Sequence, residues 1–155
     1  MVKEIILASK SGVRKKILEL NNIKCKIEPS SVDEDSVKES LLKEKANPTI
    51  ISKNLAELKA NKISQKFTEE MVLGADSVID LEGEIISKPN DRAEALEILK
   101  KMNGKTHQLI SSVCISRGGS MIWNYTDKAS LTMKNMTLLE PVSYTHLTLP
   151  TMVQV

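Results

Sequence analysis

Three short polar segments carry the residue types that bind phosphate or move a proton. They are Ser9–Arg14 (SKSGVR), Gly74–Ser77 (GADS) and Ser87–Pro89 (SKP), and each ends or interrupts an apolar run. In open α/β folds, ligands bind at the loops that follow strand ends. The three segments therefore predict a ligand site, and their basic residues favour an anion as its ligand.

The first segment has the composition of a phosphate-binding helix start. A Ser/Gly turn before a helix offers free backbone N–H groups and the positive end of the helix dipole, and Arg14 on the first turn can bond two phosphate oxygens. Ser9 and Ser11 add hydroxyl groups. An ordinary helix cap explains the same residues. Neither GxxxxGK[ST] nor GxGxxG spacing is present, so this segment alone does not define a nucleotide site.

Asp76 is the most unusual of these residues, because it is a carboxylate inside the apolar stretch LGADSVI. A buried carboxylate needs hydrogen bonds, a cationic partner or a metal ion. From the residue alone, a functional role and a structural ion pair explain it equally well. Lys88, taken by itself, has the character of an exposed surface lysine.

The elements that must position these segments alternate between strand and helix, which predicts an α/β fold with a mixed sheet. Strands are expected at 4–8, 25–28, 71–81, 84–86, 107–116 and 121–133, and helices from about 13, at 33–45, at 47–63 and from 91 to just before 104. The dipeptides Glu82-Gly83 and Gly118-Gly119 predict hairpin turns.

Capping patterns mark the helix starts. Ser31 with Glu34 three residues later resembles a capping box, and Asp91 with Glu94 repeats the pattern. Asn47 before a proline indicates the start of the third helix. In that helix, apolar residues at 51, 55 and 58 are expected on one face, with Lys53 and Lys59 elsewhere on the helix.

Bulk properties exclude several classes of protein. The chain has 155 residues, enough for one domain with or without a small lobe, and its formal net charge is only +2, which does not suit nucleic acid or a membrane surface. Aromatic residues make up 3%, too few for a base-stacking platform. The apolar run after residue 4 is too short for a signal peptide, which predicts a cytoplasmic protein. Cys25 and Cys114 are expected to be reduced and buried.

Six segments in the same order resemble the Maf family. They are Ile6–Leu18, Ser31–Glu34, Leu55–Ala60, Gly74–Val78, Gly83–Pro89 and Gly104–His107. The resemblance implies a two-lobed mixed sheet with flanking helices and a central cleft, similar to the inosine triphosphate pyrophosphatases. It also implies hydrolysis of a nucleoside triphosphate to the monophosphate and pyrophosphate, as a house-cleaning enzyme for non-standard or surplus nucleotides. Two alternatives remain open: a nucleotide-binding regulatory module linked to cell division without turnover, and an inert truncation product.

The same resemblance assigns roles to individual residues. Asp76 matches the catalytic proton acceptor, and Glu34 matches an acid near a divalent cation, Mg²⁺ or Mn²⁺. Asp76 could orient or deprotonate the attacking water, or instead hold that cation together with Glu34. The substrate-binding positions are Ser9, Ser11, Arg14, Lys59 and Lys88, and the positions linked to base preference are Val13 and Ser77. Family members often have Ser-Pro-Arg-Arg where this chain has Ser11–Arg14, so a valine replaces one arginine and the base preference stays open. A homodimer is also left open.

The end of the chain has a different character. Residues 142–151 read VSYTHLTLPT, which resembles the translation of a transposon-end adapter used in sequencing libraries. We therefore expect 142–155 to be a non-native tail. The Maf-like domain is then expected to span 1–141 and to be incomplete at its C-terminus.

Overall fold

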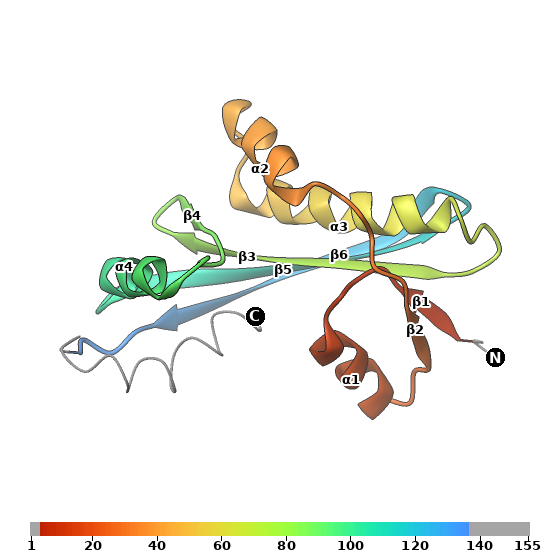
Figure 1. Ribbon diagram of the computed structural model, residues 1–155, viewed down its shortest axis with the longest axis horizontal. Coiled ribbons are helices and arrows are strands. Elements are labelled where there is room, and N and C mark those ends of the chain that lie inside the picture. Colours follow the sequence, from red (N-terminus) through yellow and green to blue (C-terminus); the bar gives the residue numbers. More distant parts are fainter. Residues whose placement is uncertain (1–3, 137–155) are drawn as a thin grey trace. The chain divides into compact units, whose positions relative to one another are not determined.

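The computed structural model describes residues 4–136, which form a six-stranded mixed sheet with flanking helices (Figure 1). The elements in chain order are β1 (Ile5–Leu7), α1 (Gly12–Leu20), β2 (Cys25–Ile27), α2 (Glu34–Lys43), α3 (Pro48–Ser64), β3 (Val72–Leu81), β4 (Glu84–Ile86), α4 (Arg92–Met102), β5 (Thr106–Arg117) and β6 (Ser120–Thr132). Each predicted strand and helix is present, with bounds that differ by a few residues. The predicted tail at 142–155 lies outside the described residues.

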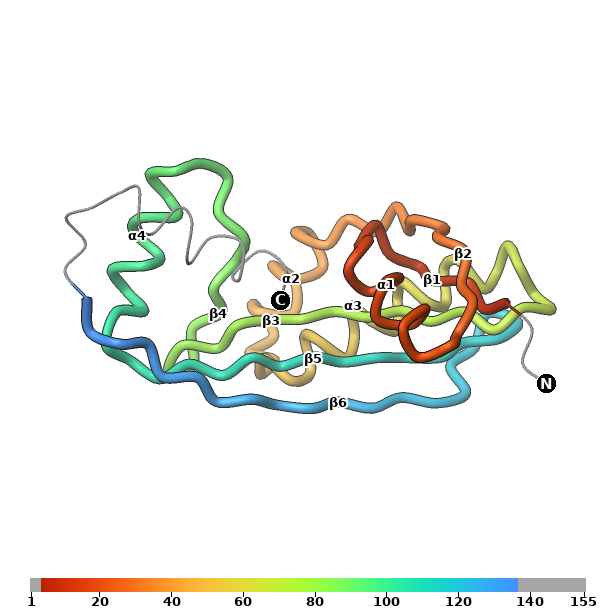
Figure 2. Tube along the Cα trace, turned by 90° about the horizontal axis from the view of Figure 1, so that it is seen from below, coloured from red at the N-terminus to blue at the C-terminus, as the bar shows by residue number. Residues whose placement is uncertain are grey.

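The strand order is β2-β1-β3-β5-β6, with β4 paired to β3, and Figure 2 shows β3, β5 and β6 running side by side. Strand β1 is parallel to both β2 and β3, whereas β4 is antiparallel to β3. The β3–β4 turn places Glu82 and Gly83 at φ 52° and 94°, and the β5–β6 turn places Gly118 and Gly119 at 61° and 84°. Two successive positive φ angles are typical of the tight turns whose twist suits a hairpin, which confirms both predicted hairpins.

The chain divides into two compact units, as the two-lobed fold predicts. The first unit contains residues 4–76 and 111–127, and the second contains 77–110 and 128–136. The core of the first unit is formed by Ile6, Ala8, Ala56, Ala60, Ile63, Val72 and Cys114. In the second unit, Leu81, Ile86 and Met102 form one cluster, and Ala95 and Leu99 form another. The predicted cleft stays a prediction.

Helix α3 carries Lys59, one of the predicted site residues of the first unit. Asn47 caps it as predicted, because its side chain accepts a hydrogen bond from the Ile50 backbone N–H at 2.9 Å. Figures 1 and 2 show α3 and α1 on opposite sides of β3. Gly74 of β3 lies so close to α3 that a Cβ atom at this position would lie 2.3 Å from the Ala56 carbonyl oxygen. Helix and strand therefore pack backbone against backbone.

This close packing corrects the predicted face of α3. Leu58 is 41% exposed, although the apolar spacing placed it with Ile51 and Leu55, which are both fully buried. The buried residues of the helix are Ile51, Ser52, Leu55, Ala56, Lys59, Ala60, Ile63 and Ser64. Small residues at positions 56 and 60 allow the close approach to Gly74, and this rotates Leu58 out of the core.

The N-caps of α2 and α4 differ in how well they match the prediction. Helix α2 is capped by Asp33, which accepts from the Ser36 N–H at 3.1 Å, so the predicted capping by Ser31 is wrong. In the second unit, Asp91 accepts from the Glu94 N–H at 2.8 Å, as predicted. Either carboxylate places negative charge at a helix N-terminus, where the helix dipole favours it.

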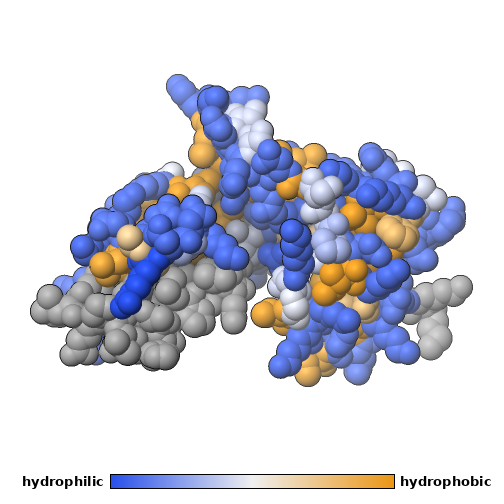
Figure 3. Space-filling model, viewed as in Figure 1, coloured by the Kyte–Doolittle hydropathy of each residue, from blue (hydrophilic) through white to orange (hydrophobic). Residues whose placement is uncertain are grey.

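Helix α1 buries little of its apolar surface. Val13, Ile17 and Leu20 are 40%, 54% and 74% exposed, and apolar residues interrupt the hydrophilic surface in this region (Figure 3). Cys25 and Cys114 are buried and free, as predicted. None of the helices within residues 4–136 combines the length and the apolar character needed to cross a bilayer.

Candidate active site

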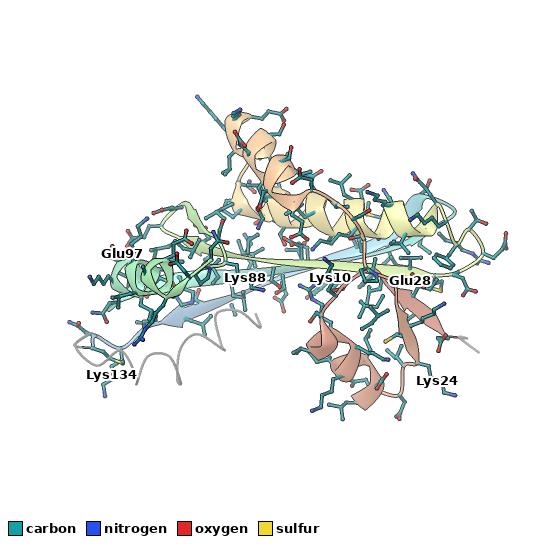
Figure 4. The ribbon with its side chains drawn as sticks, in the orientation of Figure 1. Lys10, Lys24, Glu28, Lys88, Glu97 and Lys134 are labelled. Carbon is teal, nitrogen blue, oxygen red and sulfur yellow. The ribbon has the colours of Figure 1, made fainter. Side chains whose placement is uncertain are left out.

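The turn between β1 and α1 holds the first group of predicted site residues. Ser11 is the N-cap of α1 and accepts from the Arg14 N–H at 3.2 Å. Ser9 is buried, and its Oγ accepts from the Ser11 N–H at 3.1 Å and from Arg14 Nη1 at 3.2 Å. Within residues 4–136, no acceptor takes the Ser9 hydroxyl proton, so this hydroxyl retains a donor for an anion. The exposed Lys10 lies in the same turn (Figure 4).

Arg14 connects this turn to β3. Its Nη1 donates to the Ala75 carbonyl oxygen at 3.2 Å, across 61 residues of sequence. Burial lowers the pKa of Arg14, while the charges of Asp76 and Glu34 act in the opposite direction. Among the described residues, no bond is made by Nη2 or Nε of Arg14. The guanidinium is therefore anchored on one side and keeps donors that can fork onto phosphate oxygens.

Lys59 joins three elements of the first unit. It projects from α3 and donates to Asp76 Oδ1 at 3.2 Å and to the Ala75 carbonyl oxygen at 3.3 Å. It also forms an ion pair with Oε1 of Glu34, at the start of α2. Only 7% of Lys59 is exposed, so the prediction that it lies on α3 away from the buried face is wrong.

Asp76 is the buried acid at the centre of this group. It is 5% exposed, and its Oδ2 is buried without a hydrogen-bond partner among residues 4–136. Burial raises the pKa of Asp76, and the nearby ammonium groups of Lys59 and Lys38 offset part of that rise. A carboxyl group with a raised pKa suits a general base at neutral pH, because its proton affinity is closer to the working pH.

The structure thus brings together the predicted residues of the first unit around the end of one loop and the middle of β3. The residues joined by hydrogen bonds or ion pairs are Ser9, Ser11, Arg14, Glu34, Lys59 and Asp76. Val13 is the second residue of α1 and is 40% exposed. Ser77 follows Asp76 in β3 and begins the second unit, and Lys88 is an exposed residue after β4 in that unit (Figure 4). The roles of all these residues, the linked ones included, stay predictions.

Sequence reasoning missed two groups that hold the site. Ser52 of α3 is fully buried and donates its hydroxyl to the Asp76 carbonyl oxygen at 3.1 Å. The Ala75 carbonyl accepts from both Arg14 and Lys59. A serine seven residues before Lys59 on a helix lies on the same face, and that spacing could have indicated Ser52. A backbone acceptor leaves no such signal in the sequence.

The fold and this cluster define an α/β protein in which a buried carboxylate lies near two cationic side chains. The structure is similar to that of a Ham1 protein from Staphylococcus aureus, with a TM-score of 0.52 and 16% identity over 84% of this chain and 70% of that one. It is also similar to a nucleoside-triphosphatase / dITP/XTP pyrophosphatase from Mycobacterium abscessus, with a TM-score of 0.53 and 12% identity over 84% of this chain and 74% of that one. At these identities the likeness concerns the fold alone.

Residues 4–150 match the family described as Maf-like protein, and the chain belongs to this family. It is 89% identical over 144 residues to a nucleoside triphosphate pyrophosphatase of Pelagibacter ubique (strain HTCC1062), covering 93% of this chain and 74% of the relative. A relative of the same description from Ruegeria sp. (strain TM1040) is 42% identical over 86% of this chain and 67% of the relative. A 7-methyl-GTP pyrophosphatase of Rhizobium etli is 34% identical over 88% of this chain and 69% of the relative. The predicted family is confirmed.

Proposed function

We propose that the chain hydrolyses a nucleoside triphosphate to the monophosphate and pyrophosphate, with Asp76 as the proton acceptor. The observation that carries this proposal is the buried Asp76 carboxylate, 5% exposed, with one unpartnered oxygen beside two cationic side chains. Family membership and the 89% identical relative described as a nucleoside triphosphate pyrophosphatase support the reaction type. The substrate is a non-standard or surplus nucleotide.

The residues of the first unit have distinct parts in this reaction. Arg14 and Lys59 bind phosphate oxygens, and the Ser9 hydroxyl and the start of α1 donate hydrogen bonds to the same anion. A water oxygen attacks the α-phosphorus, the bond from that phosphorus to the bridging oxygen breaks, and pyrophosphate leaves. Asp76 takes the water proton, for which its raised pKa is suited.

The site also fits a divalent cation. Glu34 and Asp76 supply carboxylate oxygens, the ligands that Mg²⁺ prefers, and Asp76 Oδ2 has no other partner. The two cations and two carboxylates of the cluster cancel formally, so the cluster by itself has no surplus charge to neutralise a triphosphate. A bound Mg²⁺ or Mn²⁺ supplies that charge and polarises a phosphoryl oxygen. Glu34 and Asp76 are the residues that would hold it.

The decisive experiment compares pyrophosphate release by the wild-type chain and by Asp76→Asn, over a panel of nucleoside triphosphates with Mg²⁺. We expect turnover by the wild type and its loss in the variant, since the amide accepts no proton. Circular dichroism and cooperative unfolding check that the variant is folded. Wild-type protein that binds nucleotide without releasing pyrophosphate would identify the regulatory module instead, and a chain without a cooperative transition would identify the inert product.

A substitution of Lys88 tests whether this residue of the second unit contributes to substrate binding. If it binds substrate, Lys88→Met should raise KM and lower kcat/KM by about tenfold, the effect of losing roughly one charged hydrogen bond. Lys100→Met, an exposed lysine of α4 in the same unit, removes an equal charge and serves as the control. Equal kinetics for the two variants would remove Lys88 from the site.

A further inference from the structure

Lys59 has no donor left for a substrate in this structure. An ammonium group has three N–H donors, and Nζ of Lys59 has three acceptors: the Ala75 carbonyl oxygen at 3.3 Å, Asp76 Oδ1 at 3.2 Å and Glu34 Oε1. The side chain is also buried, with an exposed fraction of 9%. Lys59 can bind a phosphate only if it gives up at least one of these bonds.

Arg14 provides the contrast. It uses Nη1 for both of its bonds, to Ser9 and to Ala75, and among the described residues its other nitrogens are unbonded. A phosphate can therefore bind Arg14 without breaking a contact of the free protein. The two cations of the cluster therefore differ: Arg14 has donors available for a phosphate, whereas Lys59 has none.

The Lys59 ammonium also lies between the two carboxylates that we propose as the ligands of a divalent cation. It lies in contact with one oxygen of Glu34 and one of Asp76, so the two carboxylates converge on it. The second oxygen of Asp76 is buried and has no hydrogen-bond partner in the part of the chain that the structure describes, and only 5% of Asp76 is exposed. One ammonium charge neutralises these two acids only in part, with Arg14 as the remaining counterion. A dication bound to Glu34 Oε1 and Asp76 Oδ1 would neutralise the two acids fully and would leave Oδ2 of Asp76 to accept the water proton.

We propose that Lys59 is an exchangeable internal cation, an inference that rests on the proposed function. In the free protein it holds the carboxylates of Glu34 and Asp76 together. When a divalent cation takes its place between them, Lys59 leaves the two acids, keeps its bond to the Ala75 carbonyl and turns its freed donors to a substrate phosphate. Metal binding and phosphate binding are thereby coupled through one side chain.

The test measures Mn²⁺ binding by calorimetry in the absence of nucleotide. If the Lys59 ammonium competes with the metal ion, Lys59→Met should bind Mn²⁺ at least about tenfold more tightly than the wild type, within the usual range for coupling between sites. Lys53→Met is the matched control, because Lys53 is an exposed lysine of the same helix and its loss changes the net charge equally. The double variant Lys59→Met/Glu34→Gln should lose the gain. Equal affinity in Lys59→Met and the wild type would overturn the proposal.

A second measurement uses the wild-type chain and so does not depend on the folding of a variant. In protein labelled with ¹⁵N-lysine, Mg²⁺ alone should shift the Lys59 Nζ resonance and speed the exchange of its protons with water, and an unchanged resonance at saturating Mg²⁺ would contradict the exchange. Pyrophosphate release by the wild type is assayed separately. Tighter Mn²⁺ binding by Lys59→Met without wild-type turnover would refute the proposed function and leave the exchange standing. Turnover by the wild type together with an unchanged Mn²⁺ affinity in Lys59→Met would support the proposed function and refute the exchange.

Discussion

Gly74→Ala is the most informative single substitution in the first unit, because it changes one methyl group and touches no predicted catalytic side chain. The added Cβ would lie 2.3 Å from the Ala56 carbonyl oxygen, 2.8 Å from the Ala60 backbone nitrogen and 2.9 Å from the Ala60 Cβ. Two of these atoms belong to the backbone of α3 and have no rotamer to change. The helix as a whole has to move away from β3.

The size of this movement follows from the contact distances. An ordinary contact of about 3.4 Å requires α3 to shift by roughly 1 Å. Such overpacking costs about 1–3 kcal/mol, and we expect the upper part of this range because backbone atoms form the obstacle. The same shift carries Lys59 away from Asp76, with which it is in contact at 3.2 Å. A displacement of about 1 Å can lower turnover roughly 100-fold.

Urea unfolding and steady-state pyrophosphate release measure the two effects. Gly12→Ala is the control for stability, since a Cβ at Gly12 has no atom within 4 Å and the residue lies at the start of α1. We expect the control to unfold like the wild type. If Gly74→Ala also unfolds within about 0.5 kcal/mol of the wild type, α3 does not pack on β3 as described, and the placement of Lys59 has to be abandoned.

Three further predictions concern single interactions. Ser52→Ala removes the hydroxyl that donates to the Asp76 carbonyl at 3.1 Å, so urea unfolding should show a loss of about 0.5–1.5 kcal/mol; an unchanged free energy of unfolding would contradict a stabilising role for this bond. Burial raises the pKa of Asp76, so the folded protein binds this proton more tightly than the unfolded chain, and stability falls as the pH rises from the ordinary aspartate pKa to the raised value. Urea unfolding across the acidic range should therefore show Asp76→Asn gaining stability relative to the wild type as the pH rises, whereas two parallel curves would contradict the raised pKa. Asp91→Ala removes the cap of α4, which accepts from the Glu94 N–H at 2.8 Å, and should lower the free energy of unfolding by about 1 kcal/mol; Asp91→Asn, which keeps an acceptor, should lose less.

The order of elements could be predicted because its signals are local. Gly83, Gly118 and Gly119 tolerate positive φ, and each of the two turns forms the expected hairpin, with Glu82 as the one residue of the turns that adopts a positive φ despite its side chain. The proline that follows Asn47 is an equally local signal for the start of α3, because its fixed φ suits the first turn of a helix. Each of these features depends on two or three neighbouring residues, so no knowledge of tertiary packing was needed.

The exposure of residues on α3 could not be predicted in this way. Apolar spacing put Leu58 in the core and Lys59 outside it, and the structure reverses both. A lysine is buried only when partners neutralise it, and its partners here come from α2 and β3, which are 25 residues before it and 17 after it. The rotation of the helix depends equally on Gly74, which has no side chain to hold α3 away.

The burial of Lys59 and the close packing at Gly74 have one physical cause. A helix that approaches a strand this closely must present small residues to it, and α3 does so with Ala56 and Ala60. The same approach shortens the reach from the helix to β3, so that Ser52 contacts the backbone of Asp76 and Lys59 contacts its carboxylate. Had α3 been held off by larger side chains, a lysine at 59 would extend to solvent and the acid would be buried without its cation. Residues that never touch a substrate therefore determine the charge state of the group that we propose to be catalytic.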